Sequence, residues 1–459
     1  MIIQPDQLST NSLRRSPRGN DICQVIAAAI NSADAGLAIK THVSLDADQL
    51  NISYTSYDLN EYKRVFIIGA GKAAAPMAKA IYEVVGKRIT SGAVITKDGY
   101  LGSSSTIHEK QVKIYEAAHP IPDQRNLDAS SKVISLIRIL KSDDLVICLF
   151  SGGGSSLMIM PPQGISLKNI QDTTASLLKC GATIYEINTI RKHLDDLKGG
   201  GLAKLLFPAS VITFVLSDVV GDSLDMIASG PTVADPTTYE DAWAILNKYQ
   251  ILDQIPSEIR SHISLGMAKI IPETLKPADP ILDKVKNIMV GNNTQTALAA
   301  IQAAKTIGFN TKLLTTSLHG EASQMGQSLS ESALTLLTSP THMLRPACLI
   351  AGGETTVTIK GSGKGGRNQE LALGAVKSLS GGDQIILISL ATDGGDGPTD
   401  AAGAVASNQT YSLGSAMGLY PLDYLDRNDS YHYFEPLGDL IKTGPTLTNV
   451  NDLVFIFGL

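Results

Sequence analysis

Short apolar runs rich in β-branched residues recur along the chain, and each is followed by a glycine-rich or aspartate-containing turn and then a helical pattern. Three examples between residues 65 and 222 are VFIIGAGKAAAPMAKAIYE, DLVICLFSGGGSSL and VITFVLSDVVGD. This succession is typical of βαβ units and a mostly parallel sheet. The turns are therefore expected at the carboxyl edge of the sheet, where open α/β folds bind ligands.

A more helical, proline-containing stretch, Tyr239–Asp283, interrupts this pattern before the strands and turns resume. The chain has 459 residues, which is too long for one ordinary core. We therefore predict two α/β domains, residues 1–284, which include a helical linker at about 239–284, and residues 285–459. Residues 4–20 are expected to form a frayed start.

Composition narrows the classes of function. Apolar residues make up 43% of the chain and charged residues 18%, which is typical of a soluble α/β enzyme. The net charge of −6 offers no basic surface, so nucleic acid is excluded as the main partner. No run has the roughly 18 apolar residues of a membrane span, no secretory signal is visible, and four separated cysteines indicate reduced core thiols. We expect a cytoplasmic enzyme without a membrane partner.

The first turn has the G-x-G-x-x-A spacing of dinucleotide-binding turns at Gly69, Gly71 and Ala74. The next strand ends at Lys97 and lacks the acid that would hold a ribose, which argues against a nicotinamide cofactor. Lys72 lies inside the turn, near an expected helix N-terminus, where its ammonium would strengthen anion binding. A lysine at the surface of an ordinary tight turn is the alternative.

Two further glycine-rich segments suit phosphate binding. The loop Ser151–Ser156, with the sequence SGGGSS, offers unhindered amides and three hydroxyls. The segment Ala351–Glu370 places Lys364 and Arg367 among glycines, where backbone and cationic donors could reach one anion. An ordinary exposed hairpin loop is the alternative for this segment. Neither segment is a Walker A sequence.

Cations and carboxylates complete the set of candidates. Arg191 and Lys198 belong to one helical segment and are expected to project together. Aspartates follow two other strands, at Asp218, Asp222, Asp393 and Asp396. Carboxylates in such turns suit Mg²⁺, which keeps most of its waters, although any single aspartate could form an ordinary Asx turn. This inventory, without a Ser/His/Asp order, is typical of phosphoryl transfer.

The sequence resembles the class II glycerate 2-kinases, whose C-terminal half is called the MOFRL domain, over about residues 64–452. The resemblance rests on the motifs GAGKAAAPMA, HPIPD, SGGGSS, INTIRKHLDDLKGGGLA, LSDVVGDSLDMIASGPT, GNNTQTALAA, AGGETTVTIKGSGKGGRNQELAL, ATDGGDGPTDAAGA and GPTLTNVNDL. Three positions depart from the family pattern. Asp195 stands where a serine is usual, Gly201 where a larger polar residue is common, and Leu447 where glycine often occurs.

The resemblance implies an N-terminal Rossmann-like doubly wound sheet, a smaller C-terminal α/β (MOFRL) domain, and an active site in the cleft between them. It also implies ATP- and Mg²⁺-dependent phosphorylation of the 2-hydroxyl of D-glycerate, which yields 2-phosphoglycerate and ADP. Lys72 and Arg367 would neutralise the transferring phosphoryl group, while aspartates would bind Mg²⁺ or orient the attacking hydroxyl.

The predicted site residues fall into three groups. The catalytic residues are Lys72, Arg367, Asp393 and Asp218, and the Mg²⁺ ligands are Asp222 and Asp396. The residues predicted to bind substrate or ATP are Gly71, Ser151, Gly152, Gly153, Gly154, Ser155, Arg191, Lys198, Asn292, Glu354, Lys364, Gly366 and Asn368. Which aspartate acts as the base stays open at this point.

Two other functions compete with the kinase. An NAD(P)H-dependent hydroxypyruvate reductase would use the G-x-G-x-x-A turn, but it would need the missing ribose-binding acid. A non-catalytic regulator that binds a nucleotide or sugar phosphate would keep the glycine loops without needing the aspartate turns. The sequence does not determine the oligomeric state, and a homodimer is one option.

Overall fold

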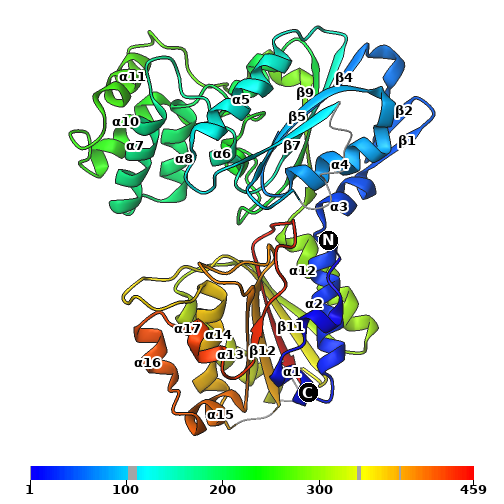
Figure 1. Ribbon diagram of the computed structural model, residues 1–459, viewed down its shortest axis with the longest axis vertical. Helices are drawn as coiled ribbons and strands as arrows, with labels where there is room; N and C mark the ends of the chain where they lie inside the picture. The colour runs from blue at the N-terminus through cyan, green and yellow to red at the C-terminus, as the bar shows by residue number, and fades with distance from the viewer. Residues whose placement is uncertain (1, 102–110, 339–342, 382–383) are drawn as a thin grey trace. The chain divides into compact units, whose positions relative to one another are not determined.

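The computed structural model describes residues 2–101, 111–338, 343–381 and 384–459 (Figure 1). The chain forms two compact units. The first unit holds residues 35–290, and the second unit holds residues 1–34 together with residues 291–459. Within the described part of the chain, no single helix is long and apolar enough to cross a membrane, whereas the bent pair Gly19–Ser32 and Ala35–His42 reaches that length and composition only when taken together.

The centre of the first unit is a six-stranded sheet in the order β6, β5, β4, β7, β8 and β9. Its strands are β4 (Arg64–Ala70), β5 (Ile89–Lys97), β6 (Val112–Ala117), β7 (Asp144–Phe150), β8 (Ser210–Leu216) and β9 (Val285–Gly291). Strand β4 is parallel to β5 and β7, β5 is parallel to β6, and β7 is parallel to β8. Counted from β4, this is the doubly wound order 3-2-1-4-5-6, which confirms the predicted Rossmann-like sheet.

Helices cover both faces of this sheet (Figure 1). Successive side chains of a strand point to opposite faces, so Phe66 and Ile68 share one face of β4. They pack in one apolar cluster with residues from α5 (Gln124–Ile137), α6 (Gly154–Leu157) and α9 (Gly201–Leu206). Helix α4 (Ala74–Val85) packs against β4, β5 and β7 outside that cluster. Strands β4 and β7, at the centre of the sheet, are therefore covered on both sides.

A second apolar cluster in the first unit lies away from the sheet. It is formed by α7 (Leu167–Lys179), α8 (Ile184–His193), α10 (Tyr239–Lys248) and α11 (Ser257–Met267). Helices α10 and α11 occupy the stretch that was expected to link the two domains. The stretch is helical, but the chain then passes through η6 (Pro280–Lys284) into β9 of the first sheet. It therefore belongs inside the first unit, and the division between the units falls after residue 290.

The remaining elements of the first unit are short. They are α3 (Ala35–His42), the antiparallel sheet of β1 (Val43–Asp46), β2 (Gln49–Ile52) and β3 (Thr55–Asp58), and the 3₁₀ turns η2 (Leu59–Glu61), η3 (Gly86–Arg88) and η5 (Ile227–Ser229). Helix α3 packs against α4.

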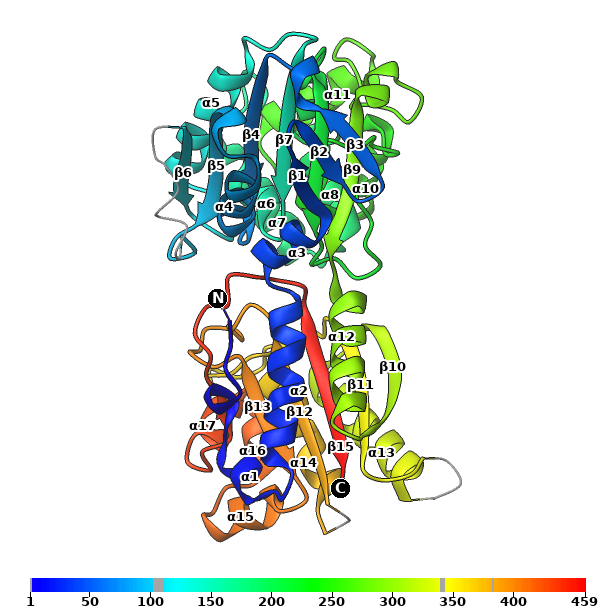
Figure 2. The ribbon, with the colours of Figure 1, turned by 90° about the vertical axis from the view of Figure 1, so that its right-hand side faces the viewer.

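The second unit holds another six-stranded sheet, in the order β10, β11, β15, β12, β13 and β14. Its strands are β10 (Asn310–Leu318), β11 (Ala347–Gly353), β12 (Ile385–Ala391), β13 (Gly403–Ser407), β14 (Leu440–Ile441) and β15 (Asp452–Gly458). Among the described strands of this sheet, only β10 and β11 form a parallel pair. Strand β15 runs antiparallel to both β11 and β12, and β13 is antiparallel to β12 and β14. Figure 2 shows β15, in red, inside this sheet. The sheet is mixed, whereas the turn pattern favoured a mostly parallel one, because hydropathy does not encode the direction of a strand.

The helices of the second unit also lie on two faces. Helices α2 (Gly19–Ser32) and α12 (Asn293–Thr306) pack side by side (Figure 2), and α13 (Ala322–Thr338) packs against α14 (Arg367–Leu379). Shorter helices are η1 (Pro5–Leu8), α1 (Asn11–Arg15), α15 (Thr410–Ala416), α16 (Pro421–Asp426) and α17 (Ser430–Phe434).

The first 34 residues belong to the second unit, although the sequence analysis assigned them to the N-terminal domain. Ile22 and Ile26 of α2 are buried in one cluster with Phe455 of β15. The expectation of a frayed start is wrong for the described residues, because Leu13 is buried and the backbone amide of Ser12 donates to Asp439 Oδ1 at 2.6 Å. A long-range partner of this kind has no local sequence signal.

One departure from the family pattern has a visible backbone consequence. Leu447 adopts a φ of +64°, in the left-handed region where a side chain costs about 1–2 kcal/mol. We expect the free energy of unfolding of Leu447→Gly to be about 0.5–1 kcal/mol higher than that of Leu447→Ala. Both variants lose the leucine side chain beyond Cβ, but only glycine also lacks the Cβ atom that causes the strain. Denaturant unfolding of the two variants measures this difference. Equal stability would show that the loop carries no strain here.

Candidate active site

Two glycine-rich loops meet at the point where the strand order of the first sheet reverses, between β4 and β7. The backbone amide of Lys72 donates to the carbonyl of Gly152 at 2.9 Å, and the amide of Ala73 donates to Ser151 Oγ at 2.9 Å. Gly71 has a φ of +145°, and a Cβ atom there would lie 2.1 Å from Ser151 Oγ. Glycine is therefore required at position 71, and the two predicted phosphate loops form one structure at the usual ligand position of a doubly wound sheet.

Lys72 and His119 both approach the second loop. A Cβ atom placed on Gly153 would lie 2.9 Å from His119 Nε2 and 3.5 Å from Lys72 Cγ. Only a residue without a side chain fits between them. His119 was not among the predicted site residues, and the signal that could have found it is the HPIPD motif, since a histidine beside a phosphate-type loop can donate to an anion.

The end of the second loop is tied to helix α8 by a chain of hydrogen bonds. The hydroxyls of Ser155 and Ser229 are 2.8 Å apart, and Ser229 Oγ donates to Asn188 Oδ1 at 3.3 Å. Ser229 is fully buried. Because Asn188 lies on the same helix as Arg191, this chain connects the loop to the helix that carries the guanidinium.

Arg191 and Lys198 line the same cavity, but they differ in their partners. Lys198 is buried, forms an ion pair with Asp195, and donates to the carbonyl of Met158 at 3.1 Å. Burial lowers the pKa of Lys198, while Asp195 opposes that change. Lys198 thus has a structural task that its predicted binding role did not include. Asp195, which stands where a serine is usual in the family, thus supplies the negative charge that pairs with Lys198.

His193, on the same helix as Arg191, is a packed core residue. Its Nδ1 lies 2.8 Å from the carbonyl of Thr189, and its Nε2 lies 3.3 Å from Glu273 Oε2. The neighbouring Lys192 is buried and pairs with Asp225 at 2.8 Å and Asp235 at 3.2 Å. The side chains of His193 and Lys192 therefore hold α8 in place through contacts within the protein.

Asp218 and Asp222 lie on the turn after β8, which is the neighbour of β7 in the sheet. Both side chains are half-buried, and Asp222 has a φ of +56°. No group of three or more His, Cys, Asp or Glu residues that could hold a metal occurs among the described residues. The assignment of Asp222 as a Mg²⁺ ligand therefore stays a prediction, which rests on the ion's need for only one or two protein oxygens.

In the second unit, Arg367 is the first residue of α14 and contacts two acids. Its Nε and Nη2 donate to the two carboxylate oxygens of Asp452 at 2.5 and 3.0 Å, and its Nη1 donates to Glu354 at 2.6 Å. Burial alone would lower the pKa of Arg367, but Asp452 and Glu354 raise it above its usual value. The guanidinium is therefore held in a fixed orientation. Asp452 was not predicted as a site residue, and the signal that could have found it is the motif GPTLTNVNDL, which contains it.

Asp396 caps the start of α14 and was predicted as a Mg²⁺ ligand. Its two oxygens accept from the backbone amides of Asn368 at 3.1 Å and Gln369 at 2.9 Å, and the side chain is buried. Burial raises the pKa of Asp396 to about 6, while these amides lower it. A Cβ atom on Gly366 would lie 2.3 Å from Asp396 Cγ, so that glycine serves the close approach. These contacts show that Asp396 caps α14, and its role as a Mg²⁺ ligand stays a prediction.

The other predicted residues of the second unit have mixed surroundings. Asn368 is buried and accepts from Ser389 Oγ at 2.6 Å, and Asn292 caps α12. Lys364 Nζ lies 3.8 Å above the ring of Tyr431, in a cation–π contact. Asp393 Oδ1 accepts from the amide of Gly395 at 3.1 Å in an Asx turn, as the alternative interpretation of these aspartates allowed.

Asn293, next to the predicted Asn292, is a further residue that the sequence analysis did not select. Its Nδ2 donates to the carbonyls of Val450 at 2.8 Å and Asp452 at 3.0 Å. It fixes the start of β15, and through Asp452 it fixes the acid that orients Arg367. The motif GNNTQTALAA contains this signal, but only the fold distinguishes the two asparagines.

Comparisons with known proteins agree with this geometry. Residues 21–264 match a family described as a domain of unknown function (DUF4147), and residues 347–452 match the MOFRL family. The D-glycerate 2-kinase of Thermotoga maritima is 46% identical over 391 residues, covering 85% of this chain and 90% of that protein. The crystal structure of a glycerate kinase from Thermotoga maritima, 41% identical, covers 95% of this chain and 98% of that chain with a TM-score of 0.81. A protein of Agrobacterium vitis, 39% identical over 392 residues, carries the provisional name hydroxypyruvate reductase, and the match covers 85% of this chain and 86% of that protein.

Proposed function

This chain belongs to the class II glycerate kinase family, and we infer that it transfers a phosphoryl group from ATP to the 2-hydroxyl of D-glycerate. The products are 2-phosphoglycerate and ADP. The observation that carries this inference is the union of the Lys72 turn with the Ser151–Ser155 loop at the switch point of the first sheet. A lysine and glycine amides at such a strand end suit the phosphates of a nucleotide.

The proposal gives two cations the main catalytic work. Phosphoryl transfer needs little covalent help from the protein and depends on positioning and on neutralising the charge of the transferring group. Lys72 and Arg367 supply that neutralisation, with the Arg367 guanidinium oriented by Asp452. The amides and hydroxyls of Ser151–Ser155 bind phosphate oxygens that are not transferred.

An aspartate accepts the proton that leaves the 2-hydroxyl as it attacks phosphorus. Asp218 follows β8 and Asp393 follows β12, and these two aspartates are the candidates for this role. Asp222, with Asp218 on the same turn, is proposed to bind Mg²⁺, which would neutralise part of the phosphate charge when present. Asp396 is left out of this set because its oxygens already cap α14.

A coupled assay with product identification tests the function. Purified protein with D-glycerate and MgATP should release ADP and form an acid that enolase converts directly, as expected for 2-phosphoglycerate. If phosphoglycerate mutase were required, the product would be 3-phosphoglycerate and the regiochemistry would be wrong. A parallel incubation with hydroxypyruvate and NADH or NADPH should show no loss of absorbance. Loss of absorbance without ADP release would favour the reductase.

Two further expectations accompany the function. A cytoplasmic location and a homodimer stay predictions, and fractionation of cells and light scattering of the purified chain measure them. Neither is needed for the chemistry proposed above.

A further inference from the structure

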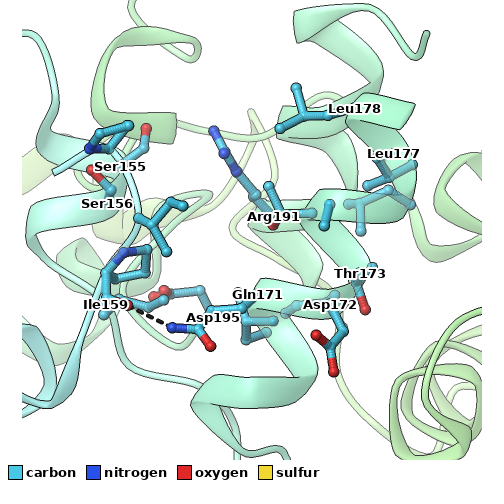
Figure 3. Close-up of a pocket in the computed structure, with 18 of the residues that line it drawn as sticks. Ser155, Ser156, Ile159, Gln171, Asp172, Thr173, Leu177, Leu178, Arg191 and Asp195 are labelled. Atoms are coloured by element: carbon cyan, nitrogen blue, oxygen red, sulfur yellow. Dashed lines mark hydrogen bonds between the residues drawn. The ribbon is translucent and has the colours of Figure 1, made fainter. Parts of the chain in front are cut away.

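The first unit contains a cavity of about 530 Å³ between helices α7 and α8 and the segment Pro120–Pro122. Its walls are mainly apolar and include Ile159, Leu177, Ile190 and Leu194. Figure 3 shows these helices around the opening, with Leu177 and Leu178 opposite Ser155 and Ser156. A cavity of this size and polarity is typical of a site for an organic ligand with a flat or apolar part.

Two cations line this cavity, and Lys198 is paired with Asp195, whereas Arg191 extends into the cavity. Arg191 projects from α8 toward the side of the cavity formed by Ser155 and Ser156 (Figure 3). Among the residues that the structure describes, its side chain has no hydrogen-bond or ion-pair partner. Arg191 is half-buried, and burial lowers the pKa of its guanidinium. A half-buried guanidinium without a partner among the described residues can bind an anionic ligand group.

The cavity continues directly into the phosphate loop. Ser155 and Ser156 line it, and they are the last residues of the SGGGSS loop. Two residues earlier, the position of Gly153 lies beside the Lys72 side chain. Cavity, loop and lysine thus form one path within the first unit. A molecule with an apolar end and a chain of phosphates would place its apolar end in the cavity and its phosphates along the loop toward Lys72.

Two of the residues that line the cavity have large apolar side chains that are exposed to solvent. Ile121 is 68% exposed and Leu178 is 63% exposed. Single exposed apolar residues are ordinary, but two of them around one apolar cavity are typical of a surface that a ligand covers.

We propose that this cavity is the subsite for the nucleoside of the phosphoryl donor, with the base and ribose against the apolar walls. Arg191 binds a phosphate that is not transferred, and the terminal phosphate reaches Lys72. Glycerate is a poor occupant, because a small, fully polar acid would leave the apolar walls unfilled and could not satisfy its hydroxyls against them. This inference rests on the proposed kinase function, and it adds the position at which the donor binds.

The test uses the full chain and two measurements. Leu178→Ala removes an exposed wall residue that the fold does not need, and Thr174→Trp fills the cavity from its lining. We expect each to weaken ADP binding, measured by calorimetry without glycerate, and to raise the KM for ATP by roughly ten-fold or more. The KM for glycerate should stay near that of the unmodified chain. Leu205→Ala, an exposed leucine of α9 that does not line the cavity, is the matched control and should change neither value.

Each other outcome overturns the proposal. A rise in the KM for glycerate with ADP binding unchanged would assign the cavity to the acceptor. Unchanged values for both substrates in a folded Thr174→Trp variant would show that the cavity is not used. These results are distinct from a failure of the kinase function itself, because that failure would appear as no ADP release by the unmodified chain.

Discussion

Replacing Arg367 by alanine is expected to lower kcat by about two or more orders of magnitude. The guanidinium is held by both oxygens of Asp452 and by Glu354, so its donors are already oriented before a phosphoryl group arrives. An interaction that strengthens as charge develops lowers the barrier of the chemical step and appears in kcat. Steady-state kinetics with saturating ATP and glycerate measure the effect. Turnover close to that of the unmodified chain would remove Arg367 from the catalytic set.

The structure also predicts that this variant is less stable. Asp452 is buried, and without Arg367 it keeps a negative charge that has lost its cation. A loss of activity could therefore come from unfolding, and a second substitution separates the two causes. The double variant R367A/D452N should recover much of the melting temperature, because the unpaired charge is gone, while kcat stays low. Recovery of activity along with stability would show that Arg367 acts only on the fold.

Arg367→Lys is the matched control for charge. It keeps one positive charge beside Asp452 but cannot form the two parallel hydrogen bonds of a guanidinium. We expect a melting temperature closer to the unmodified chain than that of R367A, with kcat still clearly reduced.

Lys72→Met is expected to lower kcat by about two or more orders of magnitude, for the same electrostatic reason. Methionine keeps most of the length of the side chain and removes only the ammonium. Lys72 is half-buried, and its backbone amide, which ties the turn to Gly152, is not altered. The melting temperature should therefore change little, and the loss should reside in the chemical step.

Lys79→Met provides the comparison for Lys72, because Lys79 belongs to the same chain segment, in α4, but lies outside the two loops. It should turn over at nearly the normal rate. If Lys72→Met and Lys79→Met were equally active, the ammonium of Lys72 would have no role in the transfer. A fall in kcat for both would point instead to a general effect of charge on the helix.

Much of the first unit could be predicted from local pattern. Strands followed by glycine-rich turns and helices indicate βαβ units, and the right-handed connection of such units restricts the sheet to few orders. Lys72 and Ser151–Ser155 were therefore expected at one edge, and the structure brings their loops together. The second sheet was harder, because the last strand, β15, enters its middle antiparallel to β11 and β12. The apolar run of β15 has the same hydropathy in either direction, so the local pattern did not indicate how this strand runs.

The amino-acid sequence alone determined the inventory of this protein: glycine turns, cations and carboxylates at strand ends, and the motifs of the glycerate kinase family. These are local properties, since the conformation of a turn and the charge of a side chain depend on few neighbours. Only the tertiary structure decided which charged groups face a ligand and which hold the fold. Lys198 is paired with Asp195 and Asp396 caps α14, while Asp452 orients Arg367 from 85 residues away. Such pairings depend on burial and on the approach of distant segments, and neither is written in the spacing of residues along the chain.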